Sequence, residues 1–261
     1  MIKFLAIAAK HGRTAEYPPP LAAGFFKKYF LHAYLAFAVM AAFPGFSSAW
    51  FDETHLAIAK AAGYPKWYNA AGADIAKIKA GDVESHNHRV NNPPGTLITP
   101  EMIMGQIKKY NQINRKGQLY GAIIQSTRDY IRVKAKGKYG EYHMAYCAHY
   151  VGDLTMPLHN IVMNDFNKKH HLTIDGIIDN GILNNYKKIQ IYSIRIRSEA
   201  DLVKEVARIA NLSMKLGYEL SAKERLLTRA EAYQQVGHSA SLLKAILEYA
   251  GRQGTTTEET P

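Results

Sequence analysis

Three side chains that can bind a metal ion lie within one short run of the sequence, HYVGDLTMPLH, at positions 149–159. They are His149, Asp153 and His159. His149 and Asp153 are four residues apart, so a helix over this run places both on one face, one turn from each other. Pro157 cannot continue a helix interior, so we expect the helix to end or bend before it. His159 then lies just beyond the break, where its side chain can turn toward the same cavity.

A second pair with the same spacing, His171 and Asp175, follows in the sequence. Imidazole nitrogens and carboxylate oxygens without a thiolate are the ligands of a hydrolytic zinc site rather than of a structural zinc finger. A single such pair is usually a surface hydrogen bond or a local salt bridge. Two pairs together with His159 favour a metal site, but the spacing alone leaves both interpretations open.

The first 49 residues differ from the rest of the chain. Two lysines precede an apolar run, 29–43, which is too short and too mixed for a membrane span. Small residues follow and end at Ala49, which is the pattern of a secretory signal cleaved between Ala49 and Trp50. We therefore predict a leader over residues 1–49 and a secreted or periplasmic mature protein. An uncleaved N-terminal anchor is the alternative.

The charge of the chain is basic, with 33 Lys and Arg against 22 Asp and Glu in 261 residues and a formal net charge of +11. Without the leader, 28 basic and 21 acidic residues remain, a net charge of +7. This excess is spread along the chain and permits an anionic substrate, phospholipid or polynucleotide, without choosing between them. The single cysteine, Cys147, excludes an internal disulfide, so an exported protein depends on its apolar core and on any bound metal.

Hydrophobic periodicity and capping residues predict helices along most of the mature chain. The run 176–196 alternates Ile and Tyr in places, but a lone strand has no partner, so we predict loop with some helix there. Polar residues 251–261 predict a disordered tail. The predicted fold class is all-α, with a single multi-helix domain over residues 50–250. The predicted helices are 54–63, 66–79, 99–114, one that begins at Gly117, the metal-bearing one that begins at Glu141, and two long ones opened by the capping boxes Ser198–Asp201 and Ser221–Glu224.

Further candidate ligands precede the central run, and together they form an ordered set. The set is Trp50 with His55 five positions later, Asp74 with His88 fourteen positions later, the run 149–159, and His171 with Asp175. This order and spacing resemble those of the zinc-dependent phospholipase C and single-strand-specific nuclease superfamily. The resemblance spans about residues 50–175 and implies an all-helical domain with three zinc ions at the bottom of a cleft.

The resemblance also implies a ligand set for each zinc ion, with Asp153 as a bridge between two of them. The implied sets are Asp74, His88, His149 and Asp153 for one ion of a closely spaced pair; the amine and carbonyl of Trp50, His55 and Asp153 for its partner; and His159, His171 and Asp175 for the third ion.

The implied reaction is hydrolysis of a phosphate ester by a metal-activated water. Asp74 is the candidate for orienting or deprotonating that water. An α-amine has a pKa of roughly 7.7–8.0, so the amine of Trp50 can bind a metal near neutral pH once the leader is removed. Leader cleavage would then complete the site. His86 and His170 lie close to His88 and His171 in the sequence and are the alternative candidates for these two ligand positions.

The choice between phospholipid and single-stranded nucleic acid depends on residues around the ligands. Glu53 corresponds to an acidic residue that lines the choline pocket of the related phospholipases, whereas Ile75 and Ser85 stand where that pocket has aromatic residues. The segment HHLTIDGI lacks the tryptophan that the nucleases usually show before the last ligand. The absence of disulfides also matches the bacterial phospholipases.

Three aromatic residues, Tyr64, Trp67 and Tyr68, could form a wall for either substrate or belong to the core. We favour a phospholipase C acting at a phospholipid surface, with a single-strand-specific nuclease as the alternative. A third hypothesis is a basic helical protein that binds membranes or nucleic acid without turnover and holds no stoichiometric zinc. Nothing in the sequence indicates an obligate protein partner.

Overall fold

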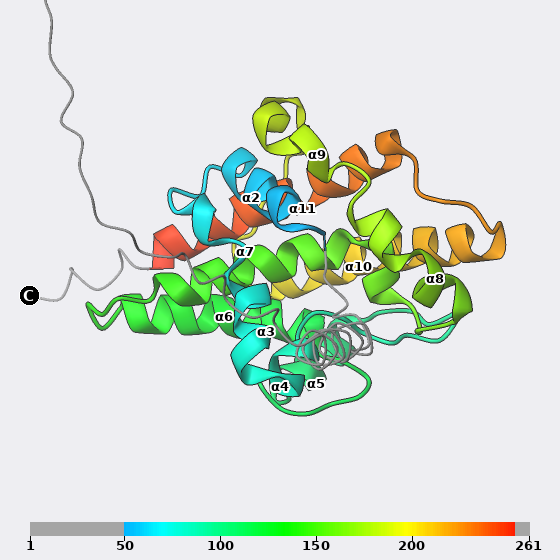
Figure 1. Cartoon of the computed structure of the whole chain (residues 1–261). Coiled ribbons are helices and arrows are strands. Elements are labelled where there is room, and N and C mark those ends of the chain that lie inside the picture. The colour runs from blue at the N-terminus through cyan, green and yellow to red at the C-terminus, as the bar shows by residue number, and fades with distance from the viewer. Residues whose placement is uncertain (1–49, 254–261) are drawn as a thin grey trace, which may run out of the picture. The chain divides into compact units, whose positions relative to one another are not determined.

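The computed structural model describes residues 50–253, so the predicted leader lies outside the described part of the chain (Figure 1). Within it the chain forms helices and no β-strand, and Val90 and Gly117 make an isolated antiparallel bridge. The predicted all-α class is confirmed. The α-helices are α2 (Asp52–Ala61), α3 (Gly72–Ala80), α4 (Asp82–Ser85), α5 (Pro100–Ile107), α6 (Leu119–Lys134), α7 (Glu141–Thr155), α8 (Asp165–Asp175), α9 (Asp179–Ile182), α10 (Glu199–Ala222) and α11 (Arg229–Gln253), with short 3-10 helices η1 (Trp67–Asn69), η2 (Pro157–Asn160) and η3 (Leu183–Lys188).

Helix α7 lies at the centre of the fold and packs against α2, α3, α6, α10 and α11 (Figure 1). Its last nine residues, 147–155, are all buried, as expected for a helix that is surrounded on every side. Met156 is extended (ψ 112°) and Pro157 follows, so the helix ends where the proline predicts. The chain then turns directly into η2, which carries His159.

A glycine allows α2 to approach α7 closely. A Cβ atom at Gly152 would lie 2.4 Å from Nδ1 of His55, well inside van der Waals contact. Any larger residue would therefore displace the imidazole. The sequence Gly152-Asp153 thus combines a small residue that admits His55 with the carboxylate that His55 faces.

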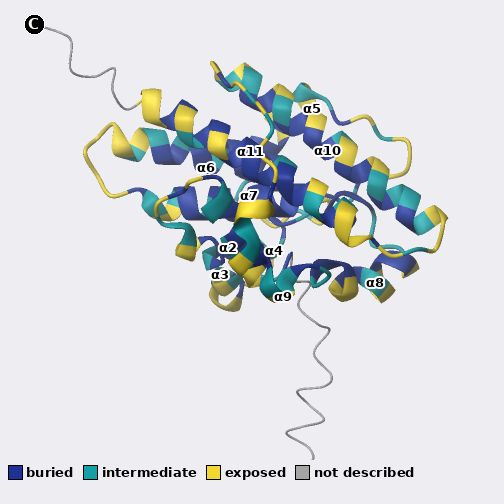
Figure 2. Cartoon of the chain, turned by 90° about the horizontal axis from the view of Figure 1, so that it is seen from above, coloured by how far each residue is buried: buried dark blue, intermediate teal, exposed yellow. Residues whose placement is uncertain are grey.

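The two C-terminal helices have the ordinary amphipathic pattern. Their inner faces bury Leu, Ile, Val and Ala, and their outer faces carry exposed charged residues (Figure 2). Ser198 and Asp201 form the predicted capping box at the start of α10. The second predicted box is wrong, because α10 continues to Ala222 and Ser221 lies in its last turn.

Two other predicted helix boundaries are also wrong. The stretch 66–79 is broken between η1 and α3, because the carbonyl of Ala70 accepts a hydrogen bond from His149 Nδ1 (2.8 Å) instead of continuing a helix. Helix α5 ends at Ile107 rather than near 114, and Asn111 adopts a left-handed conformation (φ 57°) beyond it. At the C-terminus α11 extends to Gln253, so 251–253 are helical; residues 254–261 lie outside the described part.

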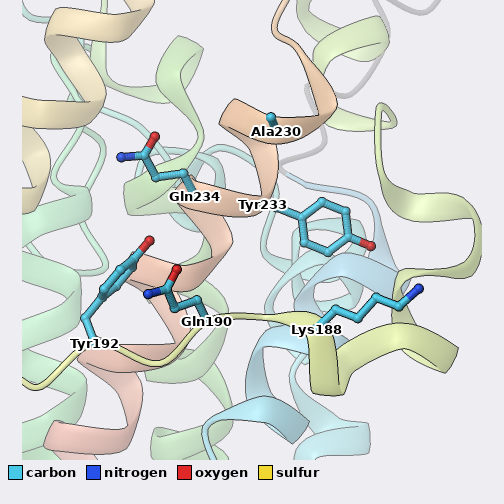
Figure 3. A pocket seen from close by; sticks show the side chains of 6 residues that line it. All are labelled: Lys188, Gln190, Tyr192, Ala230, Tyr233 and Gln234. Carbon is cyan, nitrogen blue, oxygen red and sulfur yellow. The ribbon is translucent and has the colours of Figure 1, made fainter.

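Beyond η3 the chain runs extended over 189–197 and packs on α11, as loop rather than strand. Tyr192 N donates a hydrogen bond to Ser241 Oγ at 2.7 Å, and Gly237 leaves room for the carbonyl of Gln190. Beside this segment is a cavity of about 530 Å³ (Figure 3), lined by Lys188, Gln190, Tyr192, Ala230, Tyr233 and Gln234. None of the described helices is long and apolar enough to cross a membrane.

Candidate metal centre

Asp153 lies at the centre of the candidate site. Its side chain is completely buried, and neither of its oxygens accepts a hydrogen bond. Oδ2 lies 2.8 Å from His88 Nδ1 and 3.5 Å from His149 Nε2, while Oδ1 lies 3.5 Å from His55 Nε2 and 3.8 Å from His159 Nδ1. A buried carboxylate surrounded by imidazoles requires a cation or a proton, because desolvation of an uncompensated charge is costly.

The structure brings eight of the nine predicted ligands into groups whose ligand atoms lie within 4.8 Å of one another. Two of the groups share His149, and the ring of His149 stacks on that of His55 at 3.8 Å between centroids. These groups could hold metal ions. They are His55, His149 and Asp153; Asp74, His88 and His149; and His159, His171 and Asp175.

The ninth predicted ligand, Trp50, is completely buried and lies next to His55. Burial lowers the pKa of His55 well below its ordinary value. A hydrogen bond with the backbone of Trp50 acts to raise it. The resemblance placed His55 with Trp50 and Asp153. In the structure His55 also groups with His149, so the two sets of ligands are more intermixed than expected.

The outer nitrogens of four candidate ligands are held by hydrogen-bond acceptors of the protein. Such contacts fix the tautomer of a histidine and direct its other nitrogen as an acceptor toward a metal. For His149 and His159, a carbonyl oxygen can only accept, so Nδ1 must carry the proton. The four contacts are His149 Nδ1 to Ala70 O (2.8 Å), His159 Nδ1 to His88 O (2.6 Å), His171 Nδ1 to Asn167 Oδ1 (2.6 Å) and His88 Nε2 to Glu84 Oε1 (3.3 Å).

The group formed by His159, His171 and Asp175 shows most clearly that a cation or a proton must lie between its ligand atoms. The amide nitrogen of Asn167 donates to the carbonyls of Leu158 and Val162, so its oxygen must be the atom that faces His171 Nδ1. Both His159 and His171 therefore present Nε2 as an acceptor, and these two nitrogens are only 3.1 Å apart. Two facing lone pairs repel unless a cation or a proton lies between them.

The pKa values in the centre show that only part of the ligand set is held in the form that a metal needs. Burial lowers the pKa of His88 and His159 well below the ordinary value and raises that of Asp175 well above it. Burial also raises the pKa of Asp153 to about 8. Burial acts to lower the pKa of His149, but Asp74 and Asp153 together raise it to about 9. His88 and His159 are thus neutral imidazoles ready to bind a metal, whereas a metal ion near neutral pH would have to displace protons from His149 and Asp153.

Lys77 lies inside the centre, although it was not among the predicted site residues. Its side chain is buried, and Nζ lies 2.5 Å from Asp74 Oδ1. Its positive charge acts on the pKa of His55, His88 and His149 as well. The signal was present in the sequence, because Lys77 follows Asp74 by three residues on a predicted helix and must share its face.

Glu84 and Asn167, which orient His88 and His171, were missed as well. Each precedes its histidine by four residues, so helical spacing would have indicated both. Glu84 is buried and accepts a hydrogen bond from the hydroxyl of Tyr150 (2.5 Å) and one from the amide of Asn87 (3.1 Å). This network anchors the carboxylate that supports His88.

The alternative histidines lie outside the three groups. His86 Nδ1 accepts a hydrogen bond from Asn114 N at 3.3 Å, and His170 packs against Phe166 at 4.8 Å between ring centroids. His88 and His171 are therefore the members of each neighbouring pair that the fold places in the centre.

The four predicted substrate residues have different environments. Tyr64 is 2% exposed and its hydroxyl bonds Glu141, so it belongs to the core and cannot form an open aromatic wall. Trp67 is partly buried beneath the ammonium of Lys60, whereas Tyr68 is 59% exposed. Glu53 is exposed in the first turn of α2.

No protein family, curated protein or solved structure matches this chain. The relation to the phospholipase C and nuclease superfamily therefore stays a prediction, and the geometry of the centre carries the functional argument.

Proposed function

We propose that this chain is a metal-dependent hydrolase of phosphate diesters whose centre binds three zinc ions. The facing Nε2 atoms of His159 and His171 support this most directly, because a shared cation resolves their repulsion. Burial lowers the pKa of His159, so a metal ion suits the position better than a proton. The donor set of imidazole nitrogen and carboxylate oxygen suits zinc. Bound zinc would lower the pKa of a water molecule and stabilise charge on the phosphoryl oxygens.

Asp74 and Lys77 have the positions for direct roles in hydrolysis. Among the carboxylates of the centre, Asp74 is only partly buried, with 13% of its side chain exposed, so it can reach both the centre and entering water. Burial opposes the ionisation of Asp74, yet His149 and then Lys77 hold its pKa well below the ordinary value. An ionised carboxylate at this position can orient a water molecule or accept its proton. The ammonium of Lys77 can bind a phosphoryl oxygen.

A phospholipid with a cationic headgroup is the substrate that we propose first. Asp52 and Glu53 lie in the first turn of α2, and Asp179 accepts hydrogen bonds from the nitrogen and the hydroxyl of Thr54. Burial raises the pKa of Asp52, and so does the charge of Asp74, which places Asp52 close to the centre. Neighbouring carboxylates attract a cationic headgroup and repel a polyanion.

A single-strand-specific nuclease is the second candidate, and one observation favours it. Trp67 and the exposed Tyr68 meet edge to face at 5.9 Å between ring centroids, directly before α3. Lys60 lies over Trp67 at 4.5 Å. Exposed aromatic rings beside lysines suit the stacking of bases and the binding of phosphates.

The test is a zinc determination combined with paired assays of the purified chain that begins at Trp50. One assay uses phosphatidylcholine vesicles and the other single-stranded DNA or RNA, each with and without a chelator. We expect three zinc ions per chain and diacylglycerol release that stops with chelator and returns with zinc. Cleavage of nucleic acid alone would support the second candidate. A chain without stoichiometric zinc would overturn both and leave a non-catalytic binding protein.

A further inference from the structure

Helix α3 has its charged and apolar residues on the opposite sides from those of an ordinary surface helix. Its inward face presents Asp74 and Lys77 to the centre, with 13% and 6% of their side chains exposed. Its outward face carries Ile75 and Ile78, which are 61% and 78% exposed. These isoleucines are three residues apart, so they lie side by side on one face of the helix.

The outward isoleucines have no described residue that covers them. The inward face explains why α3 carries Asp74 and Lys77, but it does not explain why two large aliphatic side chains face water. Neighbouring exposed apolar residues indicate an interaction surface when they occur together rather than singly. Tyr68, in η1 just before α3, adds a third large exposed side chain.

Helix α8, which also bears candidate ligands, repeats the combination of exposed apolar and basic residues. Leu172 is 54% exposed, directly after His171, and the exposed Lys168 and Lys169 lie one turn earlier. On α3 the exposed Lys79 directly follows Ile78. Figure 2 shows α3, α9 and α8 along the same edge of the fold.

The charges decide which partner fits this side. Residues 50–253 contain 28 Lys and Arg against 19 Asp and Glu, so the described chain is strongly basic. Aliphatic side chains flanked by lysines are typical of helices that lie in a bilayer interface, with the apolar groups in the acyl boundary and the lysines at anionic phosphates. A protein partner would need a matching apolar groove, whereas a lipid surface needs none.

We infer that Ile75, Ile78 and Leu172, with the lysines beside them, form a surface that docks on a phospholipid bilayer containing anionic lipid. Docking there holds the metal centre against the headgroups, with the carboxylates at the start of α2 facing the lipid to be cleaved. The inference rests on the proposed phospholipid substrate, but binding to vesicles can be measured without hydrolysis.

The test is sedimentation of the purified chain with vesicles of phosphatidylcholine and phosphatidylglycerol, in the presence of zinc. The double variant Ile78→Gln/Leu172→Gln should bind at least tenfold more weakly, because two aliphatic side chains are no longer buried in the acyl boundary. Leu97→Gln is the matched control: Leu97 is 70% exposed, and its neighbour Ile98 bonds Asn211 of α10, at the opposite edge in Figure 2. The control should bind like the unaltered chain.

Three further readouts separate the docking surface from the proposed function. The double variant should keep its zinc content and its hydrolysis of a short-chain phosphatidylcholine dissolved as monomers, and lose only hydrolysis of vesicles. If the unaltered chain hydrolyses vesicles and the double variant binds them equally well, the docking surface is wrong and the function stands. If the double variant instead changes oligomeric state or loses affinity for single-stranded DNA, the occupant is another protein copy or a nucleic acid, and the inference is overturned.

Discussion

The ligand-bearing helices and the C-terminal helices use buried space in opposite ways. Helix α7 buries His149 and Asp153 where no protein donor meets the carboxylate, and its first residue has no side-chain cap. Helices α10 and α11 bury aliphatic side chains, and the hydrogen-bonding groups at their first turns are capped by side chains. One region thus satisfies the polar groups of its first turns with protein partners, whereas the other buries polar groups that need a bound cation or protons.

Because of this difference, the stability of the two regions should depend on metal to different extents. Uncompensated buried carboxylates destabilise a fold, and a ligand that binds only the folded state stabilises it by mass action. The region of α3, α7 and α8 should therefore respond to zinc, while α10 and α11 should respond to ordinary changes in capping and packing. Variants in each region can test that contrast.

The largest effect on zinc content and hydrolysis rate should come from Asp153→Asn. Asp175→Asn is the variant with which it is compared. The carboxylate of Asp153 lies within 3.8 Å of nitrogens of four histidines, whereas that of Asp175 lies 3.3 Å from His171. We expect Asp153→Asn to lose two zinc ions and on the order of a thousandfold in hydrolysis rate, and Asp175→Asn to lose one ion and on the order of a hundredfold. Elemental analysis and rate measurements on both variants check this. Equal zinc losses in the two variants would contradict the shared role of Asp153.

A smaller effect is expected for Lys77→Met. Lys77 places a buried positive charge 2.5 Å from Asp74, where it partly takes the place of a metal ion. Removal of this charge should destabilise the metal-free protein by about 3 kcal/mol, because the carboxylate of Asp74 loses the buried ammonium that pairs with it. The same change should strengthen zinc binding by on the order of tenfold, because the ammonium no longer competes for the carboxylate.

Urea unfolding after chelation and zinc titration measure the two effects of Lys77→Met. Lys79→Met is the matched control, because Lys79 lies on the same helix and is exposed. It should change neither quantity by more than about 0.5 kcal/mol. Weaker zinc binding in Lys77→Met would show that the lysine supports the metal site rather than competing with it.

The arrangement around α7 could be predicted because it depends on local rules. The spacing of His149 and Asp153 fixes their common face, and Pro157 fixes where the helix ends before His159. The other candidate ligands were assigned from their order along the chain, which matches that of the superfamily that the sequence resembles. Tyr64 was assigned to a possible substrate wall and lies in the core, because the sequence does not show that its hydroxyl meets Glu141, 77 residues away.

The parts that could not be predicted depend on contacts between distant segments. The break before α3 arises because a histidine of α7 captures the carbonyl of Ala70, 79 residues earlier. The box Ser221–Glu224 failed because the same residue types fit the end of one helix or the start of another. Only the apolar face of α10, which continues through Leu220, decides between them.

The smallest effect should be found at the actual start of α11, with Glu231→Ala. Glu231 accepts hydrogen bonds from Thr228 N (2.9 Å) and Oγ1 (2.8 Å) and from both terminal nitrogens of Arg225 (2.9 and 2.8 Å). Loss of this cap should lower the free energy of unfolding by about 1 kcal/mol, because the site is largely exposed and screened by solvent. Zinc content should stay unchanged.

The pH dependence of this loss identifies the cap as its source. The hydrogen bonds from Arg225 lower the pKa of Glu231 from 4.5 to about 2. A carboxyl whose pKa is lowered on folding stabilises the protein above its unfolded pKa and ceases to do so as the pH falls through the folded value. The difference between Glu231→Ala and the unaltered chain should therefore be full above pH 4.5 and shrink toward pH 2. Glu248→Ala, at an exposed position of the same helix, should show no such trend in urea unfolding. A constant difference at all pH values would mean that the carboxylate charge does not support the cap.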